Sequence, residues 1–341
     1  MRFGDLDLDF AEGALLAHAI VLPDVKLSKG HRLANCDIDH LRRAGLSKVV
    51  AAQLDDTDVD ENQAAARLAN SLPQQGLRCS SAATGRVNVY ATVDGLCLVD
   101  RQAVDALNGV DWSITLATLA DGVSVKKGDM VATIKIIPLA VPGASLLSAT
   151  RLLEVGNPLR VLPFRSHAVT MVSTLLPALK QSTMNKTRAI FARRLRRSAS
   201  EIVAELRVRH DASSLATALR SVADKSQDPP TLVVVFGASA VIDRGDVIPE
   251  AISRAGGEVI RVGIPVDPGN LLVLGTLGNV PVIGAPGCAR SPKENGFDWV
   301  LDRVLAGSLP THAELGRLGV GGLLTEIQSR PHLRETIPIL E

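Results

Sequence analysis

The 341-residue sequence is poor in aromatic residues, in cysteine and in net charge. Aromatic residues make up only 3% of the chain, so any core has to be built from aliphatic side chains. The four cysteines are scattered and form no Cys-x-x-Cys pair. This argues against a zinc site or a disulfide framework and fits a reducing cytosol. With a formal net charge of +1, the chain has no general attraction to nucleic acid or membranes, so any anion binding has to be local.

Signals for export and for membrane insertion are missing as well. The N-terminus MRFGDLDLDF is acidic and has no basic segment ahead of an apolar one. No run approaches the ~18 apolar residues that a spanning helix needs. We therefore expect a soluble, cytoplasmic protein without a membrane or nucleic-acid partner. The histidines lack metal-ligand spacing and are interpreted as structural: His18, His31, His40, His167 and His210.

The pattern of apolar residues changes along the chain. Residues 1–75 are typical of an N-terminal α+β segment. Short alternating runs separated by turn signals indicate a β-rich module at 76–145, which ends in a linker at 140–145 with a Pro-Gly breaker. From 160 to 311 strands alternate with helices, which predicts an α/β domain with a mostly parallel sheet and helices on both faces. Residues 312–341 are interpreted as a tail or linker.

Three loops of the predicted α/β domain hold unusual residue combinations. They are FGASAVIDRGDV (236–247), PVDPGN (265–270) and GAPGCARSP (284–292). Ligands of parallel sheets bind at the carboxyl ends of the strands, so we expect these loops to lie together. Their small residues let a ligand approach the backbone closely.

The third loop runs into a predicted helix that begins at Ser291. Ser291 and Glu294 match a capping box, with Pro292 at the first helical position. Because helix N-termini favour anions, this loop is a candidate anion site, to which Arg290 and Lys293 would add charge. A well-capped helix without a ligand is the competing interpretation.

The first loop delivers Asp243 and Asp246 just before a helix. Carboxylates in such a place can hold Mg²⁺ together with ligand phosphates. They can also simply cap the helix, and we expect one of the two to do so and the other to be free for function. The basic run from Lys186 to Arg197 has no interleaved aromatic residues, which argues against single-strand nucleic-acid binding, and is interpreted as a solvated helix face.

With these loops in order, residues 165–311 resemble the molybdopterin-binding domain shared by molybdopterin molybdotransferases and molybdopterin adenylyltransferases. The resemblance is carried by VST (172–174), VVVFGASAVIDRGDV (233–247), PVDPGN (265–270) and VPVIGAPGCARSP (280–292). The segment at 13–54 is similar, more loosely, to the front region of the molybdotransferases.

The resemblance implies a molybdenum cofactor biosynthesis protein that binds molybdopterin or its adenylylated form, with Mg²⁺ and with molybdate as the inserted ion. It implies a molybdotransferase-like enzyme that forms dimers or trimers. Two alternatives stay open: a non-catalytic carrier module that serves a nucleotidyltransferase, and a nucleotide-processing enzyme on the same fold. Asp243 and Asp246 are the candidate catalytic and metal-binding residues. The candidate cofactor-binding residues are Gly237, Ala238, Ser239, Pro268, Gly269, Asn270, Pro286, Gly287, Arg290, Ser291 and Lys293.

The sequence also departs from the family pattern. Leu175-Leu176-Pro177 stands where the family has Gly-Asp-Glu, and Gly237-Ala238 replaces its Gly-Gly. Cys288 takes the place of an asparagine, and we interpret its thiol as incidental to ligand binding. The missing acidic residue favours the carrier alternative.

Overall fold

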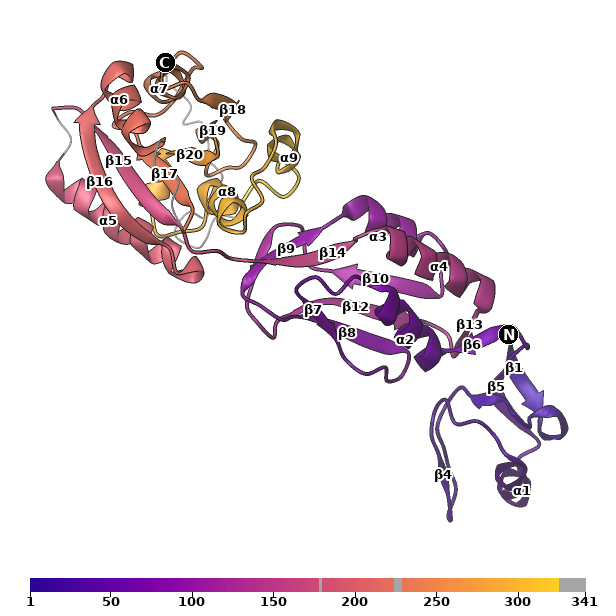
Figure 1. Ribbon diagram of the computed structural model, residues 1–341. Helices are drawn as coiled ribbons and strands as arrows, with labels where there is room; N and C mark the ends of the chain where they lie inside the picture. The colour runs from indigo at the N-terminus through magenta and orange to yellow at the C-terminus, as the bar shows by residue number, and fades with distance from the viewer. Residues whose placement is uncertain (178–179, 224–228, 325–341) are drawn as a thin grey trace, which may run out of the picture. The chain divides into compact units, whose positions relative to one another are not determined.

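The computed structural model describes residues 1–177, 180–223 and 229–324. The chain separates into two compact units, Met1–Pro163 and Phe164–Glu341 (Figure 1). The protein has an α/β fold, in which a mostly parallel sheet with helices on both faces follows a mixed, β-rich N-terminal region. Within the described residues, no helix is long and apolar enough to cross a membrane.

The first unit contains short strands and four α-helices in its described residues. Its helices are α1 (Asn35–Arg43), α2 (Glu61–Ser71), α3 (Arg101–Asn108) and α4 (Gly143–Val155), with a 3₁₀ turn η1 (Leu8–Phe10). Its strands are β1 (Arg2–Asp7), β2 (Leu15–Leu16), β3 (Ile20–Val21), β4 (Lys26–Leu27), β5 (Lys48–Gln53), β6 (Asp58–Asp60), β7 (Leu77–Cys79), β8 (Arg86–Ala91), β9 (Gly95–Val99), β10 (Ile114–Thr118), β11 (Val123–Val125), β12 (Met130–Ile136), β13 (Ala140–Pro142) and β14 (Leu159–Pro163).

Aliphatic side chains form two main cores in this unit. The smaller lies between η1, α1 and the sheet β1-β5-β2, over residues 8–51. The larger gathers α2, α4 and the strands from β7 to β14 over residues 64–161. Helix α2 therefore shares its core with the β-rich segment, and the two cores divide between Ala51 and Ala64, not at residue 75.

The predicted linker at 140–145 is wrong. Residues Ala140–Pro142 form β13, paired with β6, and α4 begins directly at Gly143. A proline is harmless at this place because the residue before a helix needs no free N–H group of its own. Pro142 has the φ of −59° that its ring prefers, and the Gly143 N–H donates to Thr57 O at 2.9 Å. The Pro-Gly pair thus begins a helix instead of interrupting structure.

The second unit is built on a single sheet. Its described strands are β15 (Ala168–Leu175), β16 (Glu201–Arg209), β17 (Thr231–Phe236), β18 (Glu258–Val262), β19 (Val273–Leu277) and β20 (Val280–Ala285), in the order β16-β15-β17-β20-β19-β18. The pairs among β16, β15, β17 and β20 are parallel, and those from β20 through β19 to β18 are antiparallel. The segment NLLVLGTLGNVPVIG (270–284), whose Gly278-Asn279 predicts the turn of a hairpin, forms the hairpin β19-β20. Strand β14, expected as the start of this domain, pairs instead with β9 of the first unit.

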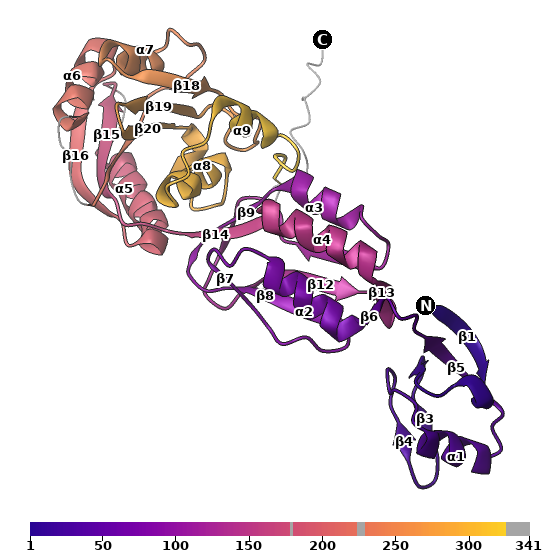
Figure 2. The same ribbon diagram turned by 45° about the vertical axis from the view of Figure 1, so that its right-hand side comes forward.

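Helices cover both faces of this sheet, as predicted (Figures 1 and 2). Strand β17 explains why: Leu232, Val234 and Phe236 point to one side and Val233 and Val235 to the other, all buried. Burying each such side chain contributes about 1.5–3 kcal/mol, so both faces need a cover. On one face lie α5 (Gln181–Leu195) and α8 (Gly296–Leu305), and on the other α6 (Ala212–Ala223) and α7 (Val247–Arg254).

Three shorter helices complete this unit: η2 (Arg196–Ser198), η3 (Gly287–Arg290) and α9 (His312–Arg317). Helix α9 lies inside the segment expected as a tail. Its Leu315 is fully buried in the core of the α5 side. Beyond it, Gly322 O accepts from Asp267 N at 2.8 Å, and Leu324 N donates to Asp267 O at 3.0 Å. Residues up to Leu324 therefore belong to the fold, and 325–341 lie outside the described residues.

Candidate functional site

The sheet of the second unit brings the three predicted loops to one edge. Because β15, β17 and β20 are parallel neighbours, the segments that follow β17 and β20 leave from the same edge. Strand β19 runs antiparallel to β20, with Val273 opposite Gly284, so residues 265–272 enter β19 from that edge too.

Direct contacts join the three loops. Arg290 Nη2 donates to Gly237 O at 2.9 Å. Gly296 N donates to Pro268 O at 2.9 Å. A Cβ atom on Gly269, whose φ is +137°, would lie 2.5 Å from Gly296 N, so only glycine fits where the second loop crosses the start of α8. The edge is a connected set of loops.

The predicted helix start at Ser291 is wrong. Helix α8 begins at Gly296, and Asn295 is its N-cap: Asn295 Oδ1 accepts from Phe297 N at 3.1 Å. Asp298 Oδ2 accepts from Asn295 N at 3.0 Å, which completes a capping box. With Gly296 N bonded to Pro268 O, these first N–H groups are occupied within the protein. The helix start is therefore not the anion site that the sequence suggested.

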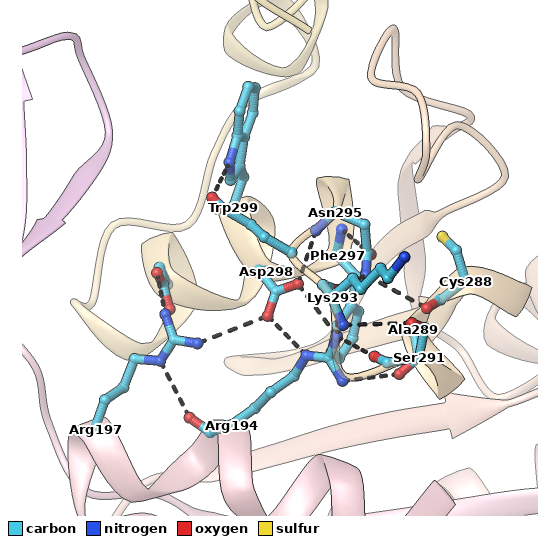
Figure 3. A network of polar contacts seen from close by, with 12 residues as sticks. Arg194, Arg197, Cys288, Ala289, Ser291, Lys293, Asn295, Phe297, Asp298 and Trp299 are labelled. Atoms are coloured by element: carbon cyan, nitrogen blue, oxygen red, sulfur yellow. Dashed lines mark hydrogen bonds and ion pairs between the residues drawn. The ribbon is translucent and has the colours of Figure 1, made fainter. Parts of the chain in front are cut away.

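The segment before α8 is held by Arg194 of α5, as Figure 3 shows. The Arg194 side chain is only 7% exposed, and its Nε donates to Asp298 Oδ1 at 2.7 Å. Its other nitrogens donate to three backbone carbonyls: Ala289 O at 2.9 Å, Ser291 O at 2.7 Å and Lys293 O at 3.1 Å. These bonds keep residues 291–293 out of a helix, although Ser291 and Glu294 satisfy the rules for a helix start. The apolar residues that follow at helical spacing predict the buried face of this helix, and the structure confirms it: Phe297, Val300, Leu301, Val304 and Leu305.

The basic run of α5 is thus more than a solvated face. Arg197, in the 3₁₀ turn η2 that follows α5, donates from Nη1 to Asp302 Oδ2 at 2.7 Å, and its Nη2 lies 3.6 Å from Asp298 Oδ1. We call Arg194, Arg197, Asp298 and Asp302, with the loop from Ala289 to Asn295, the Arg194 cluster. Asp298 and Asp302 of α8 are buried, and a buried carboxylate needs an opposite charge, which the two arginines supply.

Asp246 and Asp243 have different surroundings. Asp246 is the N-cap of α7: Oδ1 accepts from Val247 N at 2.7 Å and Oδ2 from Ile242 N at 3.1 Å. The exposed Asp243 accepts from Gly245 N at 2.7 Å through Oδ1 only. Among the described residues, no three His, Cys, Asp or Glu side chains gather to hold a metal. A Mg²⁺ ion here would need oxygens from a ligand besides Asp243, as Mg²⁺ bound to phosphates commonly has.

A second arginine at this edge, Arg290, has no such pairing. Its Nη1 donates to Thr187 Oγ1 at 2.8 Å, and its guanidinium carbon lies 5.5 Å from the centre of the Phe236 ring. Burial lowers the pKa of Arg290 below its usual value, and within the described part of the chain no carboxylate opposes that effect. A half-buried cation without a counter-charge is costly. An anionic ligand would supply the negative charge that this guanidinium lacks.

Strand β15 ends with two buried hydroxyl groups, Ser173 on the face of the sheet where Arg290 lies and Thr174 on the opposite face. Ser173 is in register with Phe236, so it lies on the same side of the sheet, and its Oγ has no hydrogen-bond partner among the described residues. Thr174 Oγ1 accepts from Ala238 N at 2.8 Å and lies 2.9 Å from His210 Nδ1. We call this group the strand-end site: Ser173, Thr174, Thr187, His210, Gly237, Ala238 and Arg290.

The other predicted residues fall into two groups. Gly237, Ala238 and Arg290 belong to the strand-end site, and the exposed Ser239 follows it. Gly287 is also exposed, with open space around the position of a Cβ atom. By contrast Pro268, Gly269, Asn270, Pro286, Ser291 and Lys293 have backbone atoms in hydrogen bonds or close contacts that shape the loops.

Sequence reasoning missed Arg194, Thr187 and His210. Arg194 stands in a run of similar arginines, and its carboxylate partner lies 104 residues away along the chain. Thr187 and His210 belong to no local sequence motif.

Two shallow surface hollows lie elsewhere: one of about 440 Å³ between Asp7 and Ser47, and one of about 420 Å³ between Arg188 and Ile202. Neither hollow is lined by the three loops, so the size of a hollow does not favour the strand-end site as a ligand site. What favours it is the Arg290 guanidinium without a facing carboxylate and the Ser173 hydroxyl without a partner in the described residues.

A family model described as "Domain of unknown function (DUF8806)" matches residues 6–53. None of the curated proteins compared with the chain matches it. Among solved structures, the chain is similar to a molybdopterin biosynthesis moea protein from Pyrococcus horikosii, with 16% identity and a TM-score of 0.31, over 93% of this chain and 77% of that one. It is similar to a molybdenum cofactor biosynthesis protein B, with 15% identity and a TM-score of 0.30, over 44% of this chain and 98% of that one. Because both TM-scores are below 0.5, neither similarity supports an inference about function. We therefore base the proposed function on the contacts of the strand-end site.

Proposed function

We propose that this protein binds molybdopterin, or its adenylylated form, in molybdenum cofactor biosynthesis, and that it is a molybdotransferase-like enzyme. The observation that carries the proposal is the half-buried guanidinium of Arg290, which no carboxylate neutralises in the described part of the chain. It lies at the edge where the sequence resembles the loops that hold the pterin and its phosphate in the molybdopterin-binding family. A phosphate group would supply the missing negative charge.

The neighbouring groups suit such a ligand. The guanidinium binds phosphate through two parallel N–H donors, and the buried Ser173 hydroxyl is an additional group able to donate. Gly287 is exposed and its Cβ position is open, so a ligand can reach the backbone there. Ala238 and the exposed Ser239, which follow Gly237, have small side chains. These contacts would orient a phosphate-linked substrate without a covalent nucleophile.

A magnesium ion would be held jointly by Asp243 and the ligand. Among the described residues, Oδ2 of Asp243 accepts no hydrogen bond, whereas both oxygens of Asp246 accept backbone N–H groups. When bound, Mg²⁺ would neutralise phosphate charge, and molybdate would enter as a substrate. We therefore assign Asp246 to helix capping and Asp243 to the metal.

The proposal is tested by measuring the affinity for adenylylated molybdopterin in the wild type and in Arg290→Met. Loss of one charge-assisted contact should weaken binding about 10- to 100-fold, because such hydrogen bonds contribute ~1.5–3 kcal/mol. Arg193→Met, an identical change at an exposed position of α5, is the control and should bind as the wild type does. Equal affinities in the two variants, or binding of a nucleotide but not of a pterin, would overturn the proposal.

A carrier without catalysis is the second candidate. It is favoured by Leu175-Leu176-Pro177 in place of the family's acidic motif and by the use of Asp246 as a cap. Incubation of the complex with molybdate and Mg²⁺ separates the two candidates. Release of nucleotide supports the enzyme, and stable binding without release supports a carrier that passes its ligand to a nucleotidyltransferase.

A further inference from the structure

The loop that carries Arg290 is held in an unusual way. Arg194 does not touch Arg290 itself but binds the carbonyl oxygens of the residues on either side of it, Ala289 at 2.9 Å and Ser291 at 2.7 Å. A third bond to Lys293 O continues the same alternation. Between these two carbonyls, the Arg290 side chain donates to Thr187 Oγ1, earlier on α5, and to Gly237 O at the end of β17.

We propose that Arg194 is a positioning residue for the anion site: it fixes the loop so that the Arg290 guanidinium is presented at the ends of β15 and β17. This inference rests on the proposed function only for the identity of the ligand. The geometry of the loop holds with or without a ligand.

Arg194 has two roles, which substitutions can separate although Nη2 takes part in both: besides two of the carbonyls, it reaches Asp298 Oδ2 at 3.4 Å. Its Nε pairs with Asp298, and this pairing compensates a buried charge. The terminal nitrogens hold the carbonyls, and a planar fork of fixed donors is needed to reach all three. Replacing a buried ion pair by neutral groups is often harmless to stability. The carbonyls, however, would still lose their donors.

Asp298 also accepts from Asn295 N, so the neutral replacement has to keep that acceptor. Asparagine does this through Oδ1, which makes Arg194→Met/Asp298→Asn the informative double variant. It removes the ion pair as a unit, retains the cap of α8 and deletes the three carbonyl contacts. Lysine at position 194 is the complementary change, because it keeps a positive charge near Asp298 without the planar fork.

The experiment has a ligand-free and a ligand-bound arm. Hydrogen exchange of the amides in residues 287–295, followed by peptide mass spectrometry, reports the order of the loop without a ligand. The dissociation constant for adenylylated molybdopterin reports the site. Urea unfolding shows whether each variant is folded, and Arg193→Met is the control at an exposed arginine of the same helix.

We expect both 194 variants to fold, to exchange the 287–295 amides at least about tenfold faster than the wild type, and to bind the ligand about tenfold more weakly. Wild-type exchange and affinity in a folded double variant would show that Arg194 is only half of a stabilising ion pair and would overturn the inference. If the double variant does not fold, Arg194→Lys decides the question by the same two readouts. If the wild-type protein does not bind the ligand, the proposed function fails, while the exchange arm still tests the positioning role.

Discussion

The Arg194 cluster and the strand-end site lie at the same edge of one sheet, and both contain an arginine away from full solvent. In the Arg194 cluster the buried guanidinium meets a buried carboxylate and three carbonyls, and the helix start beside it has its first N–H groups satisfied. In the strand-end site Arg290 donates to two neutral acceptors, and Ser173 Oγ has no hydrogen-bond partner among the described residues. A region that satisfies its own polar groups is built for stability, whereas one that leaves them incomplete is available to a ligand.

The largest effect should come from breaking the ion pair of the Arg194 cluster. In Asp298→Ala, Arg194 stays buried without its counter-charge and Asn295 loses its acceptor. We expect a loss of about 3–5 kcal/mol in the free energy of unfolding, measured with urea. Glu250→Ala removes the half-exposed partner of Arg254 on α7 and should cost about 0.5 kcal/mol or less. A cost for Asp298→Ala as small as that of the control would contradict the role of the cluster.

The glycines of the two loops offer a matched pair. Gly269→Ala places a Cβ atom against the backbone of Gly296 and forces a left-handed conformation on alanine. We expect a loss of about 3 kcal/mol from overpacking and strain together. Gly287→Ala meets open space at an ordinary φ and should stay within about 0.5 kcal/mol of the wild type. Thermal unfolding measures the stability of both variants. Similar melting temperatures for the two variants would mean that the second loop does not pack closely against the start of α8.

Neighbouring hydroxyls of β15 should respond in opposite directions. Thr174→Val leaves Ala238 N without its acceptor and should cost about 1–2 kcal/mol. Ser173→Ala removes a buried hydroxyl that has no partner in the described residues, and should leave stability unchanged or raise it by up to about 1 kcal/mol. Urea midpoints distinguish the two changes. A clear loss in Ser173→Ala would show that this hydroxyl already has a stabilising contact.

The smallest effect concerns Cys288, between the two regions. Burial raises the pKa of this thiol above its usual value, and the charges of Asp267 and Asp298 add to the rise while that of Arg194 opposes it. The thiol should therefore stay protonated near neutral pH, and its alkylation should accelerate only at higher pH than in the unfolded chain. Peptide mass spectrometry of Cys288 in native and urea-unfolded protein measures both profiles. Coincident midpoints would contradict the buried setting.

Much of the fold could be predicted because it depends on local patterns. The fully apolar run of β17, the hairpin β19-β20 and the buried face of α8 follow from the period of the apolar residues alone. The linker predicted at 140–145 failed because a Pro-Gly pair suits a helix start as well as a break. The tail predicted from residue 312 is wrong up to Leu324, because the burial of Leu315 and the backbone bonds to Asp267 depend on elements distant in the sequence.

The sequence by itself determined most strands and helices of the second unit, because the period of the apolar residues is a local property. The alternation of strands and helices also predicted that the three loops leave one edge of a mostly parallel sheet. Only the tertiary structure decided between Ser291 and Asn295 as the start of α8, and between Asp243 and Asp246 as the cap of α7. Both pairs satisfy the same local rules. The choice at α8 was made by Arg194, about a hundred residues earlier, whose buried charge and donors need Asp298 and the three carbonyls, and such a need exists only once the helices pack on the sheet.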